Sequence, residues 1–209
     1  MIKLLKLNNN FQHIYLIFYI LIVSITCLII PSRLVHSNIY WSIGTGLTLT
    51  TLLFILSVND IKKMHLPLNQ CRIGFVIGML VTIITSNSYQ FIPMFFLIAD
   101  HLLAAIFSII IMKTISYISR ALLRKEALGL GDAELAAMGG AWIGIHGISL
   151  AMAYAFVTAG LYSFIKLISG KHKTLDPFPF APFIANGVWL VWLFEPKLWI
   201  EQWVKLLAI

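Results

Sequence analysis

Long apolar stretches alternate with short polar segments along almost the whole chain. A helix that crosses a bilayer about 30 Å thick needs about 20 apolar residues. Proline and glycine separate several of the apolar stretches, at Pro31, at Gly144–Gly147 and in a proline cluster over 177–182. The pattern predicts an all-α bundle of about seven transmembrane helices, at 11–30, 39–58, 71–86, 91–112 (with an amphipathic continuation to Leu123), 132–144, 147–168 and 180–194.

The composition agrees with a membrane protein. Hydrophobic residues make up 60% of the 209 positions and charged residues only 11%, whereas soluble domains are about a quarter charged. The lipid bilayer is therefore the expected environment. We divide the chain into a basic head with the first span (1–38), a central membrane domain (39–194) and a tail (195–209) that is expected to lie in the interface as an amphipathic helix.

The basic residues predict the orientation. Lys and Arg collect in the cytoplasmic loops of membrane proteins. With the N-terminus in the cytoplasm, only three of the 15 Lys and Arg residues fall in segments placed outside, namely Arg33, Lys197 and Lys205. This distribution explains the net charge of +7 by topology and anionic lipid, so no nucleic-acid partner is expected.

Two aspartates fall at the same predicted depth. Asp60 ends the second span and Asp132 begins the fifth, so both lie at the cytoplasmic surface although 72 residues separate them. A carboxylate near a bilayer is costly unless it has water, a partner or a function. Gly129 and Gly131 let the backbone approach other groups closely, and Asp132 is expected to cap the following helix. A capped helix start is the simpler alternative, but the pair of aspartates favours catalysis.

Two neighbouring carboxyl groups can share one proton. The ionised group then acts as a base on water, while the protonated group polarises a carbonyl. This chemistry is hydrolysis without a covalent intermediate, and it requires neither a metal nor another cofactor.

Other ionisable residues fit this chemistry less well. Glu134 is turned about 200° from Asp132 around a helix. Asp100, beside His101, falls towards the outer side, where a hydrogen-bonded structural role is expected, and Asp176 is expected to be a solvated loop acid. No metal site is expected, because the histidines are scattered without an H-x-x-x-H pair and the two cysteines, Cys27 and Cys71, form no C-x-x-C.

Three segments, in order, resemble the signature motifs of type IV prepilin peptidases. The G-x-G-D region runs from Gly129 to Gly144. Asp60 followed by Leu66-Pro67 is similar to the segment of the family's first aspartate. The stretch from Pro179 to Ala185 is similar to the family's late P-F-x-P-F motif. The match spans residues 60–187, and three motifs in the right order are far more specific than G-x-G-D alone.

The resemblance implies a multi-pass aspartic endopeptidase of the bacterial inner membrane. Such enzymes remove the short basic leader of type IV prepilins or pseudopilins on the cytoplasmic side. Asp60 and Asp132 match the two catalytic acids, and the residues expected to bind substrate or shape the site are Gly129, Gly131, Pro67, Pro179 and Pro182.

Departures from the family pattern bear on the activity. Many members carry a cytoplasmic C-x-x-C domain and also N-methylate their product; its absence here favours a peptidase-only form. Glu134 stands where Lys is common. The alternatives are a non-catalytic scaffold of a pilus or secretion machine, a proton-coupled transporter and a presenilin-type intramembrane protease. The chain lacks both the repeat symmetry of transporters and the P-A-L motif of presenilins. The oligomeric state is not predicted.

Overall fold

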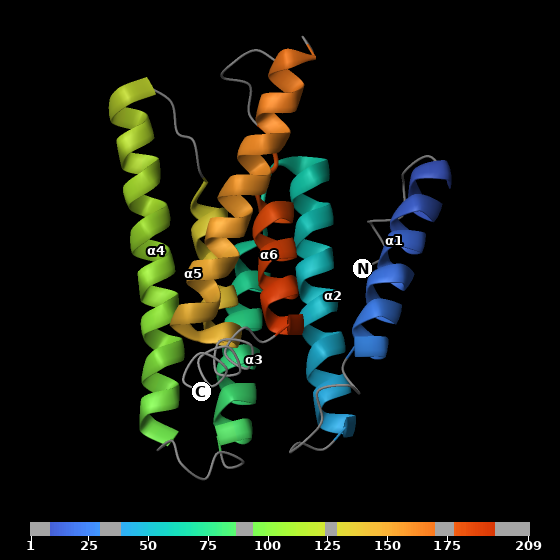
Figure 1. Cartoon of the computed structure of the whole chain (residues 1–209), viewed down its shortest axis with the longest axis vertical. Helices are drawn as coiled ribbons and strands as arrows, with labels where there is room; N and C mark the ends of the chain where they lie inside the picture. Colours follow the sequence, from blue (N-terminus) through green and yellow to red (C-terminus); the bar gives the residue numbers. More distant parts are fainter. Residues whose placement is uncertain (1–8, 30–38, 87–93, 124–128, 170–177, 195–209) are drawn as a thin grey trace, which may run out of the picture.

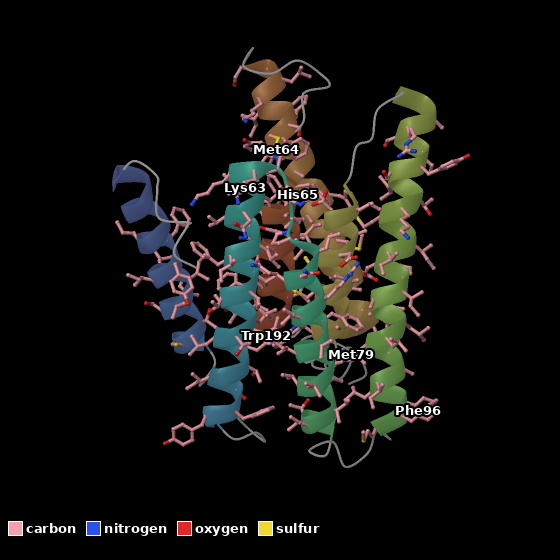
Figure 2. All side chains as sticks on the ribbon, turned by 180° about the vertical axis from the view of Figure 1, so that it is seen from behind. Lys63, Met64, His65, Met79, Phe96 and Trp192 are labelled. Carbon is pink, nitrogen blue, oxygen red and sulfur yellow. The ribbon has the colours of Figure 1, made fainter. Side chains whose placement is uncertain are left out.

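The computed structural model describes residues 9–29, 39–86, 94–123, 129–169 and 178–194. These residues form six α-helices and no strand, and from α2 onward successive helices run antiparallel (Figure 1). The helices are α1 (Asn9–Ile29), α2 (Ile39–Lys63), α3 (Leu68–Ser86), α4 (Met94–Leu123), α5 (Leu130–Ile168) and α6 (Ala181–Phe194). We call the end of the bundle where α2 ends and α5 begins the Asp60 end; Figure 2 marks it with Lys63, Met64 and His65.

Helix α5 turns back on itself. Its 39 residues would span about 59 Å if straight, nearly twice the thickness of a bilayer. The helical dihedral angles are interrupted at Gly144, whose φ of 67° and ψ of −178° suit only glycine. A first limb (130–143) therefore runs away from the Asp60 end, and a second limb (145–168) returns to it (Figure 1).

The prediction of seven spans maps onto these six helices. The spans expected at 132–144 and 147–168 are the two limbs of α5, and the amphipathic continuation of the fourth span to Leu123 is part of α4. Four helices, α2 to α5, are long and apolar enough to cross a membrane. Pro31, the first eight residues and the tail after Phe194 lie outside the described residues.

The first limb of α5 lies between α3, α4 and α6: Trp142 approaches Gly78, Gly140 approaches Ala104 and Gly139 approaches Val188. It is rich in small residues, and both Gly139 and Gly140 are buried. A Cβ atom at Gly140 would lie 2.8 Å from the backbone carbonyl carbon of Ala104 in α4. Small residues allow this close approach of two helix backbones, as is common in membrane bundles.

Many hydroxyl side chains within the apolar helices are satisfied locally. Hydroxyl groups donate to the carbonyl one turn earlier, for example from Ser108 to Ala104 at 2.7 Å. Two further bonds connect the peripheral α1 to the bundle. The hydroxyls of Tyr19 and Thr51 lie 3.0 Å apart, and the indole N–H of Trp189 donates to Thr26 at 3.1 Å.

Candidate active site

Asp60 and Asp132 come together at one end of the bundle. Asp60 lies in the last turn of α2 and Asp132 in the first turn of α5. Their exposed fractions are only 6% and 9%, and the two carboxyl groups are close enough to interact electrostatically. The structure therefore brings together the two acids that the sequence singled out.

A short connection places Asp60 beside the start of α3. Met64 ends α2 in the left-handed conformation, with a φ of 48°, and its N–H donates to the carbonyl of Asp60 at 2.7 Å. Pro67 then caps α3, since its carbonyl accepts the N–H of Gln70 at 2.9 Å. Pro67, which was predicted to shape the site, thus fixes where α3 begins. The preceding residue, Leu66, packs against Gly131 of α5.

The carboxyl group of Asp60 is held by the first residue of α6. Its Oδ2 accepts the backbone N–H of Ala181 at 3.1 Å. Ala181 lies between Pro179 and Pro182, so the late motif reaches the aspartate through its backbone. The N-terminus of a helix carries partial positive charge, which favours a carboxylate at this position.

Asp132 is held in a similar way by its own helix. Its Oδ2 accepts the backbone N–H of Gly129 at 3.1 Å. The expectation that Asp132 caps a helix starting at Ala133 was wrong in register. Gly129 is the N-cap residue, the helix begins at Leu130, and Asp132 is the third helical residue, which reaches back to the cap.

The start of α6 is anchored by aromatic side chains. Phe178, Phe180 and Phe183 pack against one another and against Phe156 and Tyr162 of the second limb of α5, with the rings of Phe156 and Phe180 5.3 Å apart. This cluster holds the start of α6, where Ala181 donates to Asp60. Sequence reasoning could not find that Ala181 donates to Asp60, because every residue except proline carries a backbone N–H.

The remaining acidic candidates have other partners. Glu134 forms a two-pronged ion pair with Arg72 of α3, with N–O distances of 2.9 and 3.2 Å. Asp100 lies at the break in α5, where its Oδ2 is 3.4 Å from the N–H of Ile145, and it is not part of the aspartate pair. Asp176 lies outside the described residues. Within the described part of the chain, no three His, Cys, Asp or Glu residues are placed to share a metal ion.

Comparison with known proteins supplies the context for this geometry. Residues 47–164, which contain both aspartates, match the model of the type IV leader peptidase family. Curated relatives named prepilin leader peptidase/N-methyltransferase are 24% identical in Aeromonas salmonicida, 25% in Stutzerimonas stutzeri and 26% in Pseudomonas aeruginosa, each over 163 residues. These alignments cover 78% of this chain and 53–54% of the relatives, so the chain spans about half their length. No solved structure matches the chain.

Proposed function

The chain belongs to the type IV leader peptidase family, and from that premise we propose that it is a membrane aspartic endopeptidase. Its substrate is a type IV prepilin or pseudopilin, from which it removes the basic leader at the cytoplasmic face. One observation supports this most strongly: two aspartates 72 residues apart in the sequence are buried beside each other within the segment that matches the family.

In the proposed reaction, Asp60 and Asp132 share one proton. The ionised carboxylate takes a proton from a water molecule, and the resulting hydroxide attacks the scissile carbonyl. The protonated carboxyl group donates a hydrogen bond to that carbonyl oxygen as negative charge develops on it. The proton taken from water then passes to the leaving amine, the C–N bond breaks, and the pair returns to its initial protonation state. Either aspartate can serve as the base.

The backbone contacts indicate which oxygen atom of each carboxyl group is free to react. In each carboxyl group Oδ2 accepts a backbone N–H, from Ala181 in one case and from Gly129 in the other. We assign Oδ1 of each group to the water and the substrate. Groups held in place by the fold need little reorganisation during the reaction. Gly131, Pro67, Pro179 and Pro182 shape the site by fixing the helix starts around it.

We further propose that the Asp60 end of the bundle faces the cytoplasm of a bacterium, across its inner membrane. The chain then has seven membrane segments, because the two limbs of α5 count separately. The catalytic domain comprises residues 39–194, and the segments 1–38 and 195–209 flank it. The proposal covers the peptidase reaction alone and not the methylation named in the relatives.

The test is cleavage of a prepilin-type substrate in membranes that contain wild type, Asp60→Asn or Asp132→Asn at matched protein levels. Each substitution removes a group that must ionise, so we expect cleavage to fall at least a hundredfold, roughly the contribution of a general acid or base. Glu134→Gln is the matched control, because it neutralises an acid two residues from Asp132 that faces Arg72 instead.

Three results would overturn the proposal. Cleavage that survives in both aspartate variants would rule out the two-aspartate mechanism. A wild type that cuts no prepilin-type substrate would favour a non-catalytic scaffold. A wild type that cuts within an apolar helix, and ignores removal of the basic leader, would instead indicate a presenilin-type intramembrane protease.

A further inference from the structure

The break in α5 leaves several backbone groups without their usual helical partners, among them the N–H of Ile145 and the carbonyl of Ala141. In a continuous helix the N–H of Ile145 would donate to the carbonyl of Ala141. Gly144 interrupts the helix between them, so this bond is not available. The break lies at the far end of the first limb, and Gly144 is about 18 Å along the helix from Asp132 at 1.5 Å per residue.

The position of the break makes these groups costly. The first limb, residues 130–143, is only about 21 Å long, which is less than the roughly 30 Å of bilayer hydrocarbon. If Leu130 starts at the membrane surface, the break lies at membrane depth. Non-helical backbone is tolerated there only where protein groups or a water-filled cavity satisfy it.

Three polar side chains from neighbouring helices meet the two groups. The N–H of Ile145 lies 3.4 Å from Oδ2 of Asp100. The carbonyl of Ala141 lies 2.9 Å from Nδ1 of His101 and accepts the hydroxyl of Thr82 at 3.3 Å. Thr82 and His101 are buried, with exposed fractions of 4% and 9%. The contact of His101 with a carbonyl requires the tautomer that carries hydrogen on Nδ1.

We propose that Asp100, His101 and Thr82 form a polar cap for this break and thereby act as positioning residues for Asp132. The first limb connects the cap to Asp132 as one uninterrupted helix. The cap fixes the far end of that limb against α3 and α4. It therefore fixes the position of Asp132 along the axis of the first limb. The position of Asp60 is fixed separately, by α2 and α6. This positioning effect rests on the proposed catalytic function, whereas the cap itself does not.

Gly144 is the partner that the cap requires. A Cβ atom at this position would overlap Oδ2 of Asp100 and lie 3.5 Å from Nε2 of His101. The left-handed φ is itself unfavourable for residues with a Cβ. The glycine thus provides both the turn and the space in which Asp100 reaches the N–H of Ile145.

A double-mutant cycle tests the cap. Asp100→Leu removes the acceptor. Ile145→Pro removes the donor while keeping the backbone, because proline fits the first position of a helix and the extended ψ of Gly144 suits a residue before proline. We expect Asp100→Leu to lower kcat roughly tenfold, the effect of leaving a partly buried N–H unsatisfied, with KM within about twofold. In the Ile145→Pro background the same change should alter kcat by less than about twofold.

Asp100→Asn distinguishes a cap from a proton carrier. The amide oxygen still accepts the N–H of Ile145, so this variant should keep at least about half of the wild-type kcat, within the usual scatter of surface-like substitutions. Ser108→Ala on the same helix is the control, since its hydroxyl bonds only to its own helix at Ala104.

The outcomes separate the two levels of the proposal. An equal loss from Asp100→Leu in both backgrounds, or a loss from Asp100→Asn as large as that from Asp100→Leu, would overturn the cap. Thermal unfolding in detergent of the wild type, the two single variants and the double variant of the cycle reports the coupling between Asp100 and Ile145 without any substrate. The cap can therefore be tested even if no prepilin is cleaved. Coupling in unfolding with unchanged kcat would overturn the positioning of Asp132.

Discussion

The two glycines before Asp132 differ in what they contribute. A Cβ atom at Gly131 would lie 2.7 Å from Cβ of Leu66, closer than real Cβ contacts come. At Gly129 the nearest atom is Oδ2 of Asp132 at 3.6 Å, an ordinary contact, and the φ of −80° is open to any residue. Gly131 therefore lets the segment before α3 lie against α5, while Gly129 contributes its backbone N–H.

This difference predicts unequal effects of alanine on stability. Gly131→Ala should destabilise the protein by about 1–3 kcal/mol, as overpacking does. Gly129→Ala should be neutral or stabilising by up to about 1 kcal/mol, because it restricts the unfolded chain. Thermal unfolding in detergent compares the two variants directly. Equal destabilisation by both would show that Leu66 does not make the packing contact.

The ion pair between Arg72 and Glu134 gives a second residue-scale prediction. The side chain of Arg72 is 64% exposed, and exposed pairs contribute little because solvent screens them. Arg72→Gln should therefore change the cleavage rate by less than about twofold, and the charge-swapped Arg72→Glu/Glu134→Arg should resemble wild type. A large loss that the swap restores would instead assign the pair a part in orienting Asp132.

At the residue scale, the sequence predicted which acidic side chains belong to the site better than it predicted their hydrogen-bond partners. Asp60, Asp132 and the displacement of Glu134 followed from depth and helical period, and Asp100 has the hydrogen-bonded role expected of it, although it is only half-buried. The donors from Gly129 and Ala181 could not be predicted. They are backbone groups: the N–H of Gly129 is used because α5 begins at Leu130, earlier than expected, and the N–H of Ala181 is used because α6 packs against α2.

At the scale of the elements, the first limb of α5 depends on close backbone packing. A Cβ atom at Gly140 would lie 2.8 and 2.9 Å from the backbone carbon of Ala104 and nitrogen of Ala105. Backbone atoms cannot rotate away as a side chain can, so α4 would have to shift. Gly160 in the second limb has no neighbour within 4 Å of its Cβ position.

The two glycines should consequently respond in opposite directions to alanine. Gly140→Ala is expected to destabilise by about 1–3 kcal/mol through overpacking. Gly160→Ala is expected to stabilise by about 0.5–1 kcal/mol, because alanine is the better helix former. Both are read from thermal unfolding in detergent. A stabilising Gly140→Ala would contradict the close contact between α4 and the first limb.

Hydropathy located the helices well and their ends less well. α2 continues five residues beyond the predicted limit of 58, to Lys63, and α3 starts at Leu68 rather than 71. Helix ends are set by backbone hydrogen bonds, such as that from the N–H of Met64 to the carbonyl of Asp60. Hydropathy carries no information about these bonds. The separation predicted at Gly144–Gly147 is a single break at Gly144, since the remaining residues continue the second limb.

At the scale of the whole molecule, the proposed orientation can be tested on one helix. Tyr40 and Lys63 lie at opposite ends of α2, about 35 Å apart at 1.5 Å per residue. Both are exposed, Tyr40 to 82%, and Figure 2 marks Lys63 at the Asp60 end.

In a background with Cys27 and Cys71 replaced by alanine, Tyr40→Cys should react with a membrane-impermeant maleimide in intact spheroplasts. Lys63→Cys should react only after the membrane is opened, because positive charge and the aspartate pair are assigned to the cytoplasmic side. The labelled fraction on gels is the measurement. The reverse pattern would place the aspartates outside and exclude cleavage of a cytoplasmic leader.

Both aspartates are oriented by main-chain N–H groups, from Gly129 and from Ala181. A saturation mutagenesis map of the whole chain would therefore show the orienting groups only weakly, because nineteen amino acids supply the same amide hydrogen. The two aspartates would stand out as positions where even asparagine is not tolerated. Proline is the exception, since it alone lacks that hydrogen. Intolerance of proline at 129, and of proline but not glycine or serine at the buried position 181, would be the genetic signature of this site.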